Sequence, residues 1–169
     1  MNVSYVYQDE PLGLGHAVHC AADKIEGEPF FVLLGDVLVP ENNMLTRMKE
    51  ISDEHNGANV IAVLPVPETQ VAGDVWKVSA LCEKPALEEA PSNLAVFGRY
   101  LLSPRVMELL AEVKPGAGGE IQLTDALDEV LKEEEMYALI INEEDGFDTG
   151  TVESWLDTNN RLFARLKNA

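Results

Sequence analysis

Apolar residues recur along this chain in short runs that alternate with stretches of helical spacing. This alternation is typical of an α/β domain in which helices cover a largely parallel sheet. Runs of apolar and β-branched residues predict strands at 3–8, 30–35, 59–66, 75–82, 94–102 and 136–142. Apolar residues three or four positions apart predict helices at 16–24, 43–55, 105–113, 120–134 and 152–166.

Three of these regions carry more specific expectations. The helices at 16–24 and 43–55 should both pack on the sheet. Two consecutive strands, 75–82 and 94–102, are separated by a turn-rich segment, which indicates mixed strands rather than a purely parallel sheet. The last helix should begin after an N-cap at Thr151, and its apolar face is formed by Trp155, Leu156, Leu162, Phe163 and Leu166.

Composition narrows the class of protein. A chain of 169 residues with 46% hydrophobic content can bury one ordinary core, so we expect one domain over 1–169. The net charge of -18 argues against nucleic acid or an anionic membrane as a partner. The N-terminus lacks signal-peptide features and no apolar stretch reaches the roughly 20 residues of a membrane span, so we expect a cytoplasmic protein. Cys20 and Cys82 lack metal-site spacing and should be buried free thiols.

Two acidic residues lie far apart in the chain but have similar settings. Asp36 follows the apolar run 30–35, and Asp148 opens the segment Asp148-Thr-Gly-Thr151. Ligands of open α/β sheets bind beyond the carboxyl ends of the strands, where Asp36 should lie. If the fold brings the two carboxylates together, they form an oxygen-ligand site for Mg²⁺. The alternative for Asp36 is an N-cap of the next turn, and the Thr151 cap does not require Asp148.

A second candidate site lies near the N-terminus. Gly13-Leu-Gly15 follows a predicted strand and opens a predicted helix, so its amides could face a nucleotide. The alternative is a tight turn, since Val18 stands where a dinucleotide fingerprint needs its third glycine and no P-loop lysine follows. The amide of Gln8 can donate to and accept from a base edge, or it can simply be a solvated strand end.

Glu83-Lys84-Pro85 places opposite charges on adjacent residues at the end of a predicted strand. Adjacent strand residues point to opposite faces, so an internal ion pair is not the obvious explanation. The carboxylate could accept hydrogen bonds from sugar hydroxyls while the neighbouring ammonium binds a phosphate. The alternative is that the three residues form an exposed charged turn. The three histidines, His16, His19 and His55, are expected to have structural or surface roles.

The sequences of these motifs and their order along the chain resemble those of the bacterial UTP:glucose-1-phosphate uridylyltransferases, which belong to the sugar-nucleotidyltransferase family. The resemblance covers nearly all of the chain and rests on segments 8–18, 34–37, 83–85, 90–95, 98–100 and 115–126. The last of these is specific to uridylyl enzymes, whereas 148–151 is closer to the thymidylyl relatives. The resemblance therefore implies uridylyl transfer first and thymidylyl transfer second, on a Rossmann-like, mostly parallel sheet with mixed strands.

The resemblance also implies roles for individual residues. Gln8 and the backbone of Gly13 would contact uracil, and Asp36 with Asp148 would hold Mg²⁺ as the cofactor. The sugar side would use Gly73, Glu83, Asn93 and Ala95, with Lys84 meeting the phosphate. An oxygen of glucose 1-phosphate would attack the α-phosphorus of UTP and release pyrophosphate, with Lys84 and Asp36 as catalytic groups. No general base is needed, because that oxygen is already anionic.

The chain also departs from this family. Complete members begin with a strand and a Gly-rich loop carrying Gly-Thr-Arg, which wraps the triphosphate, whereas this sequence resembles the family from about its third strand onward. We therefore expect a domain truncated at its N-terminus, with open sheet edges, little activity alone, and pairing with another copy as one outcome. A non-catalytic sugar-nucleotide-binding module is the competing hypothesis. Segment 72–75 also differs from the family around Gly73.

Overall fold

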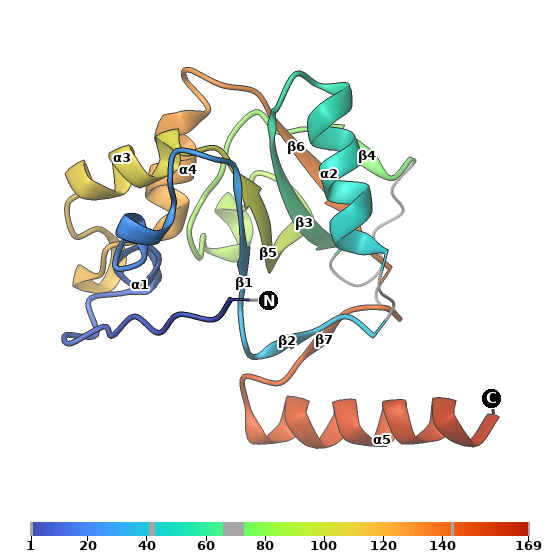
Figure 1. Ribbon diagram of the computed structural model, residues 1–169. Helices are drawn as coiled ribbons and strands as arrows, with labels where there is room; N and C mark the ends of the chain where they lie inside the picture. The colour runs from blue at the N-terminus through green and yellow to red at the C-terminus, as the bar shows by residue number, and fades with distance from the viewer. Residues whose placement is uncertain (1, 41–42, 66–72, 143, 169) are drawn as a thin grey trace.

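The computed structural model describes residues 2–40, 43–65, 73–142 and 144–168, and a five-stranded sheet lies at its centre (Figure 1). The strands of this sheet, in spatial order, are β1 (Phe30–Leu33), β5 (Leu94–Leu102), β3 (Asn59–Pro65), β6 (Met136–Ile140) and β4 (Val75–Lys77). A separate two-stranded ribbon joins β2 (Val37–Leu38) to β7 (Phe147–Asp148). The helices are α1 (Leu14–His19), α2 (Met44–Glu54), α3 (Arg105–Glu112), α4 (Leu123–Val130) and α5 (Val152–Asn168), with short 3₁₀ turns at Ala22–Lys24, Leu87–Glu89 and Ala117–Gly119.

Strand direction in the sheet is mixed. Three strands, β1, β3 and β6, run one way, and β4 and β5 run the other way. Among neighbours, β3 and β6 form the parallel pair, and the chain between them includes α3 and α4, which provide the crossover that parallel strands need. The expected α/β class with mixed strands is confirmed, with more antiparallel pairing than a largely parallel sheet implies.

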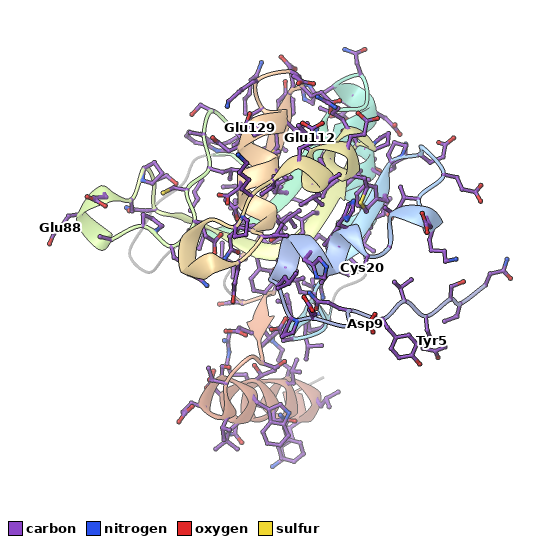
Figure 2. The ribbon with its side chains drawn as sticks, turned by 90° about the vertical axis from the view of Figure 1, so that its left-hand side faces the viewer. Tyr5, Asp9, Cys20, Glu88, Glu112 and Glu129 are labelled. Carbon is purple, nitrogen blue, oxygen red and sulfur yellow. The ribbon has the colours of Figure 1, made fainter. Side chains whose placement is uncertain are left out.

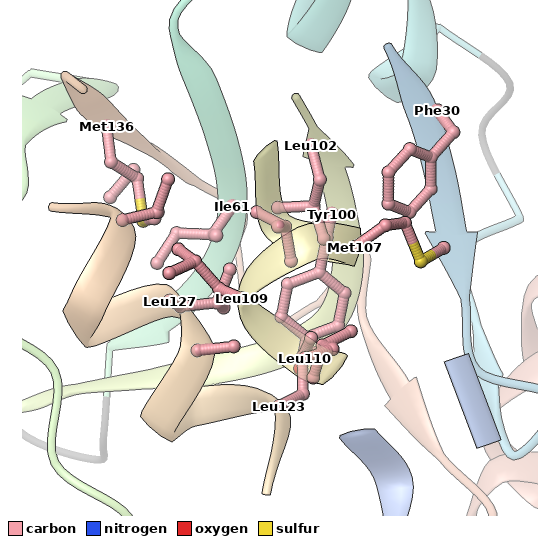
Figure 3. Packing of buried hydrophobic residues seen from close by; sticks show 14 of the residues in the cluster. Phe30, Ile61, Tyr100, Leu102, Met107, Leu109, Leu110, Leu123, Leu127 and Met136 are labelled. Atoms are coloured by element: carbon pink, nitrogen blue, oxygen red, sulfur yellow. The ribbon is translucent and has the colours of Figure 1, made fainter. Parts of the chain in front are cut away.

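Helices cover both faces of the sheet. Alternate residues of β3 point to opposite faces, so that Ile61 packs with α3 and α4 while Val60 packs with α2. The first cluster, between the sheet and α3 with α4, is shown in Figure 3. In the second, Met48 and Ile51 of α2 are fully buried against the sheet. The expected packing of α2 is therefore confirmed. Helix α1 contacts mainly α3 and α4, and its Leu14 and Val18 pack against the cluster that these helices form with the sheet.

The N-terminal strand expected at 3–8 is wrong. Residues 2–8 carry no strand pairing, and Tyr5 and Tyr7 are 85% and 84% exposed. Figure 2 shows Tyr5 on an extended segment that leads away from the rest of the molecule. The apolar pattern is compatible with a strand, but a strand forms only where a neighbouring edge is in reach.

Three further elements differ by three or more residues from their expected bounds, and the one expected at 120–134 also ends early, at Val130. The helix expected at 16–24 ends at His19 and is followed by the 3₁₀ turn, and the strand expected at 75–82 ends at Lys77. The helix expected from Glu120 begins at Leu123, because the backbone of Ile121 is used elsewhere. Its N–H donates to Leu12 O at 2.7 Å, and its oxygen accepts from Gly15 N at 2.9 Å.

Helix α5 is attached to the rest of the chain through β7 (Figure 1). Its expected N-cap is confirmed, since Thr151 Oγ1 accepts a hydrogen bond from Ser154 N at 3.0 Å. The guanidinium groups of Arg161 and Arg165 lie over the ring of buried Phe147 in β7. On the expected apolar face, Trp155, Leu156, Phe163 and Leu166 are all more than half exposed.

Both cysteines are free as expected, but the expected burial is wrong, since Cys20 is half-buried and Cys82 is exposed. Within the described ranges, no helix is both long and apolar enough to cross a membrane.

Candidate active site

The β2–β7 ribbon brings the two candidate metal ligands together. In its register, Val37 lies opposite Asp148, and Thr149 donates from both N and Oγ1 to Asp36 O, at 2.7 and 2.8 Å. The carboxylates converge near Gly150. A Cβ atom built on Gly150 would lie 3.1 Å from Asp148 Oδ1 and 3.5 Å from Asp36 Oδ2. Two acidic residues that are distant in sequence therefore face the same small volume beyond the carboxyl end of β1.

Arg99 of β5 holds the turn that carries Asp36. Its Nη1 donates to Leu34 O at 2.8 Å and to Gly98 O at 3.0 Å, and its Nη2 donates to Val37 O. One planar guanidinium can satisfy several carbonyls in a fixed arrangement. Burial lowers the pKa of Arg99, and the nearby charge of Asp36 partly opposes that shift. Arg99 thus positions the turn that places the Asp36 carboxylate.

Asp148 is held from two sides. Its Oδ1 accepts from Gly150 N at 2.7 Å, and its backbone oxygen accepts from Thr158 Oγ1 of α5 at 3.1 Å. Thr158 is only 3% exposed, so this bond is shielded from water. Helix α5 therefore fixes the strand that carries Asp148.

The donor chemistry of this pair suits a hard divalent cation. Both side chains offer carboxylate oxygens, and no cluster of three acidic, histidine or cysteine side chains that could hold a metal occurs in the described part of the chain. Mg²⁺ is commonly bound by one or two carboxylates and completes its shell with waters and phosphates. Structural zinc sites need four protein ligands, which this pair does not provide.

A cavity of about 650 Å³ lies beside the sheet. It is lined by residues of β3, β4, β5 and β6, by 78–85 and 90–92, and by the start of α4. Three of the residues assigned to the sugar side by resemblance, Glu83, Lys84 and Ala95, line it. The remaining two do not, since Gly73 and Asn93 lie outside its lining.

Glu83 is anchored at the cavity wall. Its Oε2 accepts a hydrogen bond from Thr124 Oγ1 of α4 at 2.5 Å, and Lys84 Nζ lies 3.8 Å from its Oε1. The sequence predicted no ion pair here, because adjacent residues of a strand point to opposite faces. That alternation does not apply, since β4 already ends at Lys77 and Lys84 has a φ of 43°. Burial raises the pKa of Tyr100, another lining residue, to about 12, with a contribution from Glu83.

The third group of residues lies at α1. Gln8 Nε2 donates to Gly13 O at 3.1 Å and lies 3.0 Å from His16 Nδ1. Gly13 has a φ of 111°, and a Cβ built on it would lie 2.7 Å from Ile121 O. A similar contact exists at Gly15, where the distance is 2.8 Å. Both glycines are thus needed for the loop to pack against the segment that precedes α4.

Residues 1–165 match the family model described as nucleotidyl transferase. The chain belongs to the nucleotidyl transferase family. Two similar relatives are UTP–glucose-1-phosphate uridylyltransferases, from Bacillus subtilis (43% identical) and Streptococcus pneumoniae (40% identical). The first alignment covers 83% of this chain and 51% of the relative, and the second covers 82% and 52%. The chain spans about half the length of these relatives.

Solved nucleotidyl transferase structures agree with this assignment. A UDP-glucose pyrophosphorylase complexed with UDP-glucose superposes with a TM-score of 0.86 at 33% identity, covering 96% of this chain and 66% of the other. A UTP-bound UGPase from Acinetobacter baumannii gives a TM-score of 0.77 at 33% identity, covering 94% and 58%. The expected resemblance to uridylyltransferases of this fold is confirmed.

Residues that support the nucleotidyl transferase site were not all visible in the sequence. Arg99 and Thr124 lie within segments 98–100 and 115–126, so their motifs stood out although their contacts did not. Thr158 gives no signal, because a threonine within an amphipathic helix is ordinary. Its burial against Asp148 depends on how α5 docks on β7.

Thr124→Val is expected to destabilise the chain by about 1 kcal/mol, because a carboxylate loses a charge-assisted hydrogen bond. The change keeps the size of the side chain but removes the donor to Glu83. Equilibrium unfolding of each variant in urea measures the effect. Thr124→Ser keeps the donor and should unfold like the unchanged chain; equal stability of the valine variant would show that the bond does not hold Glu83 at the cavity wall.

Proposed function

We propose that this chain carries part of the active site of a cytoplasmic UTP:glucose-1-phosphate uridylyltransferase, which forms UDP-glucose and pyrophosphate with Mg²⁺. The meeting of Asp36 and Asp148 beyond the carboxyl end of β1 carries this proposal. The names of the relatives and the bound UDP-glucose and UTP in the similar structures support the choice of substrates.

Strand β5 connects the two halves of the proposed site. Its first residues, Leu94 to Val96, line the cavity with Glu83, and Arg99 further along the same strand holds the turn of Asp36. The cavity and the turn of Asp36 thus share one strand, so a sugar in the cavity would lie on the same element that holds Asp36 in place. Glu83 would accept hydroxyl groups of glucose, and Lys84 would meet its phosphate.

The proposed reaction is an in-line displacement at phosphorus. An oxygen of the glucose 1-phosphate forms a bond to the α-phosphorus of UTP, and the bond from that phosphorus to the bridging oxygen of pyrophosphate breaks. The attacking oxygen is anionic at neutral pH, so no side chain has to remove a proton. When bound between Asp36 and Asp148, Mg²⁺ would supply positive charge against the phosphates. Lys84 would supply a second positive charge, and the rest of catalysis is positioning.

Calorimetry with UDP-glucose tests the proposal directly. The chain should bind UDP-glucose in the presence of Mg²⁺, and chelation of the ion should weaken that binding. A parallel titration with dTDP-glucose should give weaker binding; a preference for it would favour a thymidylyltransferase instead. Absence of binding to either sugar nucleotide would overturn the proposal. Binding without turnover when UTP and glucose 1-phosphate are supplied would favour a non-catalytic binding module.

A further inference from the structure

Three side chains near α1 form a hydrogen-bonded series. The amide nitrogen of Gln8 lies 3.1 Å from Gly13 O and 3.0 Å from His16 Nδ1, and His16 Nε2 lies 3.9 Å from Cys20 Sγ on the next turn. Figure 2 shows Cys20 on this part of the chain. The series connects Gln8, the residue expected to contact the base, to the Gly13 loop and to α1.

The partners determine which atoms carry hydrogen. The amide nitrogen of Gln8 can only donate, so His16 Nδ1 must accept and is unprotonated. A neutral imidazole then carries its hydrogen on Nε2, which faces the sulfur of Cys20. This assignment is consistent at every step, because thioether and thiol sulfur atoms are weak acceptors.

The same contacts determine how the amide of Gln8 faces a ligand. Its two N–H bonds point to Gly13 O and to His16 Nδ1, so its oxygen is the atom left to meet a base. If the amide turned over, its oxygen would face Gly13 O and two acceptors would be brought together. Without His16, one of the two donors would lose its partner and the orientation would be less strongly determined.

We propose that His16 is a positioning residue that fixes the side-chain amide of Gln8 with its oxygen toward the base, and that this orientation selects uracil over cytosine. The inference rests on the proposed function and on the contact with uracil that the resemblance implies for Gln8. Uracil offers a hydrogen-bond donor at ring nitrogen N3, which a fixed oxygen can accept. Cytosine has a lone pair at that position, so two acceptors would face each other and neither would be satisfied.

Binding of UMP and CMP to the full chain tests the selectivity. His16→Ala should lower the ratio of the CMP to the UMP dissociation constant by about tenfold, because the orientation of the amide then depends on its bond to Gly13 O alone. His16→Phe keeps a flat ring without an acceptor and should have the same effect if the alanine variant does not fold. His16→Asn places an acceptor oxygen near the position of Nδ1 and should restore the ratio to within about threefold. His19→Ala is the matched control and should leave the ratio unchanged.

The outcomes separate this inference from the proposed function. An unchanged ratio in both His16→Ala and His16→Phe would overturn the positioning role. Nitrogen NMR of ¹⁵N-histidine-labelled chain gives an independent reading, since it distinguishes the two neutral tautomers. We expect the hydrogen of His16 on Nε2, and a hydrogen on Nδ1 would overturn the inference whether or not nucleotides bind. Failure of the unchanged chain to bind UMP would instead overturn the proposed function, together with the selectivity that depends on it.

Discussion

Asp148→Asn is expected to lower the apparent affinity for Mg²⁺, measured in the presence of UDP-glucose, by about 100-fold, since loss of outer-shell partners alone costs 10–100-fold. The amide oxygen of asparagine can still accept from Gly150 N, so the β7 turn should keep its shape while one negative charge is lost. Asp36→Asn should have an effect of similar size, because the two carboxylates face the same volume. Titration of Mg²⁺ by calorimetry measures both variants.

Controls for the acidic pair are available in the same chain. Asp53→Asn changes an exposed carboxylate of α2 that pairs with Lys49, and should leave Mg²⁺ affinity unchanged. The double variant of Asp36 and Asp148 should lose less than the two single losses combined, because both residues serve one ion. Fully additive losses would mean that the carboxylates act on separate ions. An unchanged affinity for Mg²⁺ in both single variants would show that Asp36 and Asp148 do not bind the ion.

Gly13→Ala should destabilise the chain by about 3 kcal/mol, through backbone strain and overpacking acting together. The φ of 111° is unfavourable for any residue with a Cβ atom, and that atom would lie 2.7 Å from Ile121 O, a backbone atom that cannot easily move. Equilibrium unfolding in urea, followed by circular dichroism, measures the loss.

Gly27→Ala separates the two causes. Gly27 also has a positive φ, 77°, but no atom lies within 4 Å of a Cβ built there. Its change should therefore cost only the strain of the left-handed conformation, about 1 kcal/mol. If both variants lose the same stability, close packing of the Gly13 loop against Ile121 makes no contribution.

Elements specified by local pattern could be predicted from the sequence. The expected bounds of β5, 94–102, are those of the structure, and α2 differs from its expected range by one residue at each end. Each has a clear pattern of apolar residues between turn-forming residues, and these apolar side chains are buried in the core clusters. The same holds for the Thr151 cap, which depends on contacts within four residues.

The errors concern features that depend on distant parts of the chain. Segment 3–8 has strand-like composition but no ladder partner, and Glu120 is kept out of α4 by the bonds of Ile121 to a loop that lies far away in sequence. In the candidate site, the sequence indicated Asp36 and Asp148 as possible oxygen ligands of a metal ion. Their encounter depends on a ribbon of two residues a side, which is too short to produce a recognisable pattern.

The contacts of Arg99 have a consequence for how freely Asp36 can move. Arg99 belongs to β5, which pairs with β1 on one side and with β3 on the other, so its backbone is held by the sheet. Its guanidinium donates to the carbonyls of Leu34 and Val37, which lie on either side of Asp36 in the chain. A displacement of Asp36 would therefore break bonds to the sheet. The carboxylate is preorganised, and little conformational entropy is lost when a ligand binds to it.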